Sequence, residues 1–72
     1  MRSDYRETIT RTDQGWTIVG DPGTVYPTLQ EAWDEARQDL LHVGGGWLEV
    51  IDRRGRVRAS YMVTVQDLGH PL

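Results

Sequence analysis

Residues 28–43, followed by the three glycines 44–46, form the only stretch of this chain with the pattern of an amphipathic helix. Thr28 suits the N-cap position, and Glu31 three residues later completes a capping box. The glycines favour termination directly afterwards. Apolar residues recur at helical spacing and make one stripe: Leu29, Ala32, Trp33, Ala36, Leu40 and Val43. A single helix must bury this stripe against other elements, so we expect Trp33, near its middle, to lie in the core.

The segments before the helix have strand character. Residues 5–12 are rich in β-branched side chains but poor in apolar ones, which indicates an edge strand that pairs either within the chain or with a neighbouring molecule. A short turn leads to residues 16–19, where alternation directs Trp16 and Ile18 toward the helix. Residues 24–26 can add a third, short strand. These segments predict a hairpin with one further strand.

The segments after the helix, 47–52 and 57–65, are the longest strand signals. A type I turn that begins at Asp52, with Gly55 in the left-handed region, pairs Asp52 with Arg56. This register, which we favour, places one set on one face (Trp47, Ile51, Val57, Ala59, Tyr61, Val63) and another on the opposite face (Leu48, Val50, Arg56, Arg58, Met62). A slip of one residue instead groups Leu48 and Val50 with Val57, Ala59 and Tyr61. In both registers Arg56, Arg58 and Met62 face away from Val57 and Tyr61.

The resulting element order is β-β-(β)-α-β-β. It predicts a single α+β domain over residues 1–72, in which a small antiparallel sheet of four to five strands packs on one helix. A chain of this size buries only ~60% of the surface that its unfolded form exposes, so modest stability is expected. The tail 66–72 has no periodicity, and we expect it to be loose.

Several short motifs carry a resemblance to a known family. In order, they are Gly15-Trp16-x-Ile18, Thr28-x-x-Glu31-Ala32-x-x-x-Ala36, Leu48-x-Val50 and Gly55-Arg56-Val57. Over roughly residues 15–58 the sequence resembles a family of short bacterial domains of unknown function. The resemblance implies a β-β-α-β-β fold and gives no activity. The chain departs from it in the additional first strand, in Trp47 with Glu49, and in a longer last strand.

Composition argues against several functional classes. The chain has no cysteine, which removes disulfides and thiol chemistry and suits a reducing cytoplasm. It has no apolar run of the ~18 residues that a membrane span needs, so we expect no membrane association. His42, His70, Ser3 and Ser60 have no catalytic partner at a recognisable spacing, and no metal-binding or phosphate-binding motif is present. We therefore expect a protein that is not an enzyme and that uses neither cofactor nor metal.

The arginine-rich hairpin is one candidate binding feature. All eight basic residues of the chain are arginines, and four of them occupy its tip: Arg53, Arg54, Arg56 and Arg58. Guanidinium groups on a projecting hairpin can contact phosphates. The alternative is a solvated turn whose arginines balance nearby acids. The net charge of −3 favours this alternative, because nucleic-acid-binding domains are usually basic.

The uncovered face of the sheet is the other candidate. A single helix covers only one face, so the outer face should carry Met62, with either Leu48 and Val50 or Trp47 and Ile51, beside arginines. Apolar side chains mixed with arginine are typical of interface centres. The sequence therefore predicts a bacterial or phage binding module for a protein partner, most simply a second copy of itself. The alternatives are a nucleic-acid-binding domain or, from its acidic helix, a phage-encoded inhibitor of a host protein.

Overall fold

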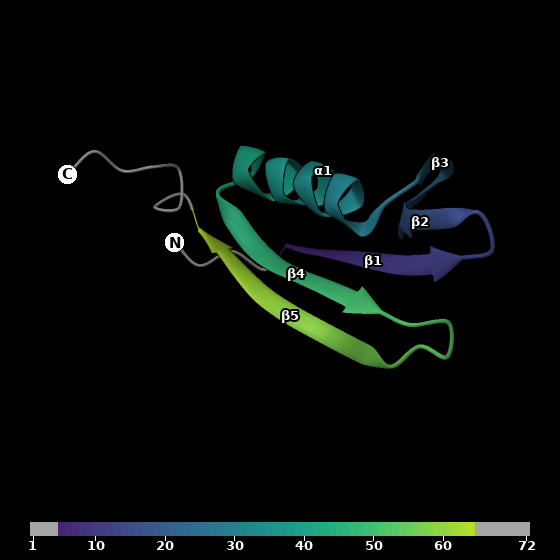
Figure 1. Cartoon of the computed structure of the whole chain (residues 1–72). Coiled ribbons are helices and arrows are strands. Elements are labelled where there is room, and N and C mark those ends of the chain that lie inside the picture. The colour runs from purple at the N-terminus through teal and green to yellow at the C-terminus, as the bar shows by residue number, and fades with distance from the viewer. Residues whose placement is uncertain (1–4, 65–72) are drawn as a thin grey trace.

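A five-stranded sheet supports one helix in the computed structural model, which describes residues 5–64 (Figure 1). The elements, in chain order, are β1 (Arg6–Thr12), β2 (Gly15–Ile18), β3 (Asp21–Tyr26), α1 (Leu29–His42), β4 (Gly45–Ile51) and β5 (Val57–Thr64). The predicted α+β class is confirmed. The expected tail 66–72 lies outside the described residues.

The helix begins and ends where the sequence predicts. The hydroxyl of Thr28 accepts a hydrogen bond from the backbone N–H of Glu31 at 3.2 Å, and it donates one to the Glu31 carboxylate at 3.3 Å. At the other end, Gly44 has a φ of +94° and donates its N–H to the carbonyl of Leu41. These contacts satisfy backbone groups that a helix leaves without intrahelical partners.

The first strand lies at the centre of the sheet, whose order is β3-β2-β1-β4-β5. It pairs antiparallel with β2 and parallel with β4, so the sheet is mixed rather than wholly antiparallel as expected. The prediction that residues 5–12 form an edge was also wrong. It relied on the low apolar content of the segment, but one fully buried side chain, Ile9, is enough where a small sheet is covered on one face only.

The β4–β5 hairpin has the predicted turn but not the predicted faces. Asp52 donates its N–H to the carbonyl of Arg56 at 2.9 Å, and Gly55 has a φ of +84°. Directly after the turn a β-bulge intervenes, because Ile51 pairs with Val57 whereas Val50 pairs with Ala59. The additional residue reverses the alternation beyond it.

The bulge makes the favoured grouping of side chains wrong. Leu48 and Val50 are buried under the helix, on the same face as Ala59 and Tyr61, as in the alternative register. Val57 differs from both registers, because it pairs with Ile51 on the outer face, the face that carries Met62. Trp47, which the favoured grouping placed with Tyr61, lies on the outer face opposite Met62.

The core lies between α1 and the inner face of the sheet. It consists of buried side chains from the helix and from four strands: Ile9, Ile18, Ala32, Ala36, Leu40, Leu48, Val50 and Val63. Two small alanines on the helix face let the helix lie close to the sheet. Trp33 differs from the expectation, because it is only half-buried, and its ring lies 6.0 Å from that of Tyr61 at the margin of the core.

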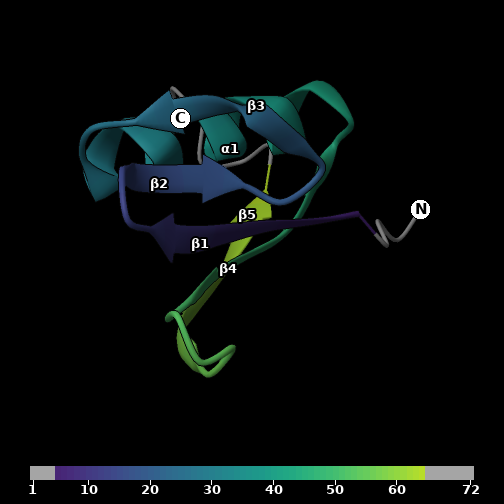
Figure 2. The same cartoon turned by 90° about the vertical axis from the view of Figure 1, so that its right-hand side faces the viewer.

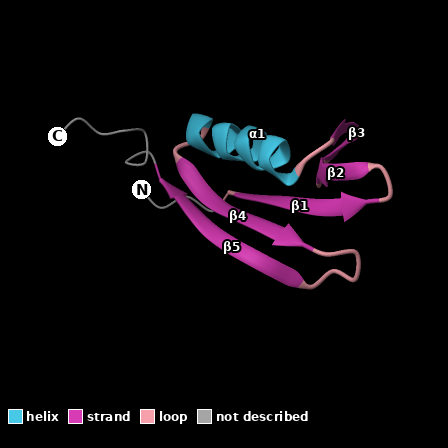
Figure 3. Cartoon of the chain, viewed as in Figure 1, coloured by secondary structure: helices cyan, strands magenta, loops and turns pink. Residues whose placement is uncertain are grey.

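Among the described residues, no element covers the second face of the sheet. In Figures 1 and 3 the helix lies above β1, β4 and β5, and no other described element lies below these strands. Figure 2 shows that the tip of the β4–β5 hairpin extends beyond the other strands. The fold therefore leaves two places where side chains gather without a covering element: the outer face of β4 and β5, and the space between the start of α1 and the hairpin.

Candidate functional site

The outer face carries an apolar pair on its two C-terminal strands. Trp47 and Met62 are direct cross-strand neighbours, and they are 40% and 41% exposed. Arg6 lies opposite Trp47 on the other side, so a row of arginine, tryptophan and methionine crosses three strands. Arg6 also forms an ion pair with Glu49 at 3.5 Å. This row matches the composition of protein interfaces, in which tryptophan, methionine and arginine are enriched.

The remainder of the outer face is mixed, because Ile51 and Val57 form a second apolar cross-strand pair there and Glu49 lies between the two pairs. Alternation along the strands places a set of hydroxyl side chains there: Thr8, Thr10, Thr12, Thr17 and Ser60. Short hydroxyl side chains allow another surface to approach closely and can form hydrogen bonds with it. The outer face therefore carries two apolar pairs, Trp47 with Met62 and Ile51 with Val57, separated by polar side chains.

Two of the four hairpin arginines, Arg53 and Arg58, lie in different surroundings. Asp52 organises the turn, because its Oδ1 accepts the backbone N–H groups of Arg54 at 2.8 Å and of Arg56 at 2.9 Å. The guanidinium of Arg53 forms an ion pair with Asp13 of the β1–β2 turn at 3.1 Å. Arg58 occupies the bulge and reaches the helix side of the sheet, away from Met62.

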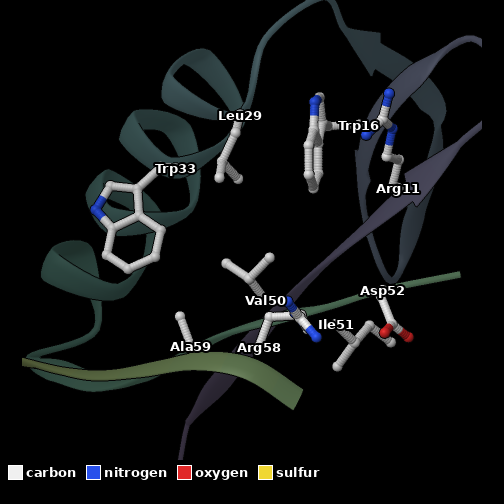
Figure 4. A pocket seen from close by; sticks show the side chains of 9 residues that line it. All are labelled: Arg11, Trp16, Leu29, Trp33, Val50, Ile51, Asp52, Arg58 and Ala59. Carbon is white, nitrogen blue, oxygen red and sulfur yellow. The ribbon is translucent and has the colours of Figure 1, made fainter. Parts of the chain in front are cut away.

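An open groove of about 540 Å³ separates the start of α1 from the hairpin (Figure 4). One side is formed by helix residues with Trp16 and Arg11, and the other by the ends of β4 and β5. The lining residues are Arg11, Trp16, Leu29, Trp33, Val50, Ile51, Asp52, Arg58 and Ala59. The volume lies within the range of ligand-binding pockets.

Basic groups flank the groove. The Arg11 guanidinium lies 5.5 Å from the centre of the Trp16 ring, a cation–π distance, and Figure 4 shows Arg58 on the opposite side. A second depression beside the groove is lined by Arg11, Asp52, Arg53 and Arg54. Apolar walls and basic margins together suit a ligand that is itself part apolar and part acidic.

Sequence reasoning missed this groove. It interpreted Trp16 and Trp33 as core side chains and assigned Arg11 no role. The apolar stripe carries no signal that distinguishes a buried from a half-buried tryptophan, since both have the same spacing. A weak signal was available in the size of Trp, which is seldom fully buried.

The catalytic candidates remain apart. His42 Nδ1 lies 2.9 Å from the carbonyl oxygen of Gln38, a contact typical of a side chain that caps the end of a helix. Ser60 lies on the outer face, whereas Ser3 and His70 lie outside the described residues. Between residues 5 and 64, no three His, Asp or Glu side chains gather in a way that could hold a metal ion.

Glu7 lies on the helix side of β1, opposite Leu48. Burial raises the pKa of its carboxyl, and the charge of Asp39 on α1 adds to the rise. A raised folded-state pKa means that folding disfavours the charged form. The folded state is therefore most stable with respect to Glu7 when its carboxyl is protonated, below the ordinary pKa of glutamate. That stability is lost as the pH rises through the higher folded-state pKa.

We therefore expect Glu7→Gln to be more stable than the wild type at neutral pH, with the difference vanishing on acidification below the ordinary glutamate range. Thermal melts at several pH values measure it. Asp39→Asn, which removes the smaller cause, should give a smaller gain. A Glu7→Gln advantage that grew toward acid pH would contradict this sign.

Comparisons with known proteins return no match: no family model, no curated protein and no solved structure resembles the chain significantly. No helix of the described chain is long and apolar enough to cross a membrane. The candidate surfaces are therefore interpreted from their own geometry and chemistry.

Proposed function

We propose that the protein is a non-enzymatic binding module that acts through protein–protein contact and associates with a second copy of itself. The observation that carries this proposal is the exposed Trp47–Met62 pair on a sheet face with no described covering element. Trp and Met together expose a large apolar area, and covering it releases water from that area.

The strand β5 supports self-association in particular. It ends the sheet order, spans Val57–Thr64, and carries a single charged residue, Arg58, at its bulged start. A long edge strand with little charge is a template for pairing with another strand. Two copies related by a two-fold axis can pair their β5 strands antiparallel with the Met62 side chains next to the axis. One sheet then extends through both copies, and the two Trp47–Met62 pairs lie side by side on its outer face and partly cover each other.

The test substitutes the apolar pair on the outer face. Met62→Glu should convert a concentration-dependent dimer to a folded monomer, since a two-fold axis introduces the charge twice into the contact. The dimer dissociation constant should rise by about 30-fold or more, which corresponds to ~2 kcal/mol for a central interface residue. Sedimentation equilibrium from low to high micromolar protein measures it.

Val25→Glu is the matched control. Val25 is 41% exposed, as Met62 is, but it lies on β3 at the opposite edge of the sheet. Its substitution adds the same charge and should leave the dimer intact. A wild-type protein that stays monomeric at high micromolar concentration would remove the basis for self-association.

The same experiment examines the nucleic-acid alternative. Adding a random duplex at low salt should not change the sedimentation of the wild type, because the net charge of −3 opposes approach to a polyanion. Tight duplex binding at physiological salt would instead favour phosphate recognition by the hairpin. In that case the slope of log affinity against log salt should become about one unit less steep in Arg54→Ala.

A further inference from the structure

The groove between α1 and the β4–β5 hairpin has the features of a second binding surface, on the opposite side of the sheet from Trp47 and Met62. We infer that it binds an acidic peptide segment of a partner protein. One large apolar side chain of that segment occupies the groove, and carboxylates on either side of it meet the flanking arginines.

The apolar part of this proposal rests on Trp16, Trp33 and Leu29. All three pack against the core but remain half-buried, so the groove exposes apolar surface at the margin of the core. Across from them, Val50 and Ala59 contribute further apolar lining. The volume of about 540 Å³ accommodates a single phenylalanine or leucine side chain with its neighbouring backbone. Tryptophan is also enriched among the few residues that contribute most of the binding energy at protein interfaces.

The acidic part rests on the balance of charge around the groove. Arg11 and Arg58 line it from different strands, and within residues 5–64 neither forms an ion pair. The nearby carboxylates are already engaged. Asp52 accepts two backbone N–H groups of its own turn, and Asp13 forms an ion pair with Arg53. The guanidinium groups are therefore available to carboxylates of a ligand, which they bind with charge-assisted hydrogen bonds.

A short acidic peptide fits this surface better than a nucleic acid does. The acidic residues Glu31, Asp34 and Glu35 lie exposed on the same helix that forms one side of the groove. A polyanion longer than the groove carries further charges over the surface of this acidic helix, and exposed like charges repel over ~10 Å at moderate salt. A short peptide with a few carboxylates around one apolar residue can place those carboxylates beside Arg11 and Arg58 and carries fewer charges beyond the groove.

The three indole N–H signals of the protein provide a direct test, because the chain has three tryptophans. The probe is a blocked five-residue peptide with phenylalanine at its centre and glutamate elsewhere, titrated into nitrogen-15-labelled protein at low salt. We expect the Trp16 and Trp33 signals to shift and the Trp47 signal, on the opposite face, to stay in place. Peptides with glutamine for glutamate, or with alanine for phenylalanine, should produce no saturable shift.

Protein variants locate the charged contacts. Arg58→Ala should weaken peptide binding about tenfold, the effect of losing one charge-assisted contact. Arg11→Ala should act similarly. Arg6→Ala, which removes an arginine from the outer face beside Trp47, should leave peptide affinity unchanged. Circular dichroism of each variant confirms that the fold is retained.

Three results would overturn the inference. They are unshifted Trp16 and Trp33 signals at millimolar peptide, shifts that instead occur at Trp47, and tighter binding of a short oligothymidylate than of the peptide at the same two indoles. The inference does not depend on self-association. The monomeric Met62→Glu variant should bind the peptide as the wild type does, so failure of either proposal is recognised separately.

Discussion

Leu40→Ala is expected to unfold most of the protein at room temperature. Leu40 is 1% exposed and lies in the last turn of α1. Its side chain points from the helix toward the sheet and lies close to Gly46 of β4. Truncating a buried leucine leaves a cavity and costs ~3–5 kcal/mol. Domains of ordinary size have ~5–15 kcal/mol of total stability, and one this small lies at the lower end. Urea titration followed by circular dichroism measures the loss.

Val43→Ala is the control for this prediction. Val43 follows the helix by one residue and is 43% exposed, so its truncation should change stability by no more than ~0.5 kcal/mol. If Leu40→Ala unfolded cooperatively with the same urea midpoint as the wild type, the helix would not pack on the sheet through Leu40.

Gly46→Ala is the second substitution with a large expected effect. A Cβ at this position would meet the backbone carbonyl oxygen of Tyr5 and would lie 2.8 Å from Cδ2 of Leu40. The neighbouring Trp47 N–H donates to the same Tyr5 carbonyl at 2.9 Å, so the strands cannot separate without weakening this bond. We expect a loss of ~1–3 kcal/mol, typical of overpacking.

The loss in Gly46→Ala should lower the melting temperature by roughly 4–8 °C per kcal/mol in a domain of this size. Gly23→Ala is the matched change, because a Cβ there meets no atom within 4 Å and the residue does not have a positive φ. It should melt within a few degrees of the wild type. Equal melting temperatures for the two variants would contradict the close approach of the first strand to Gly46.

The two proposed surfaces lie on opposite sides of one hairpin. Trp47 and Met62 face outward from β4 and β5, whereas Val50 and Ala59 of the same strands face the groove. A module of this kind can hold a second copy through the sheet and a partner segment through the groove at the same time. The bulge at Arg58 is central to this arrangement, since it directs that arginine toward the groove.

The sequence by itself determined the local features. The helix ends follow from Thr28 with Glu31 and from Gly44, and the hairpin turn follows from Asp52 and Gly55, as the observed hydrogen bonds confirm. Each of these features depends on groups only a few residues apart, so the amino acids that make the contact also carry the signal.

The tertiary structure alone decided the position of the first strand and the faces of the last hairpin. The pairing of β1 with β4 joins residues about forty positions apart, and the strand composition did not reveal that β1 is central. The bulge at Arg58 exchanges the two faces of β5 relative to β4, so that Ala59, Tyr61 and Val63 share the helix side of the sheet with Leu48 and Val50. The free energy gained by burying Leu48 and Val50 exceeds the cost of interrupting the hydrogen bonds between β4 and β5 at the bulge. This gain exists only when the helix and the sheet are packed together.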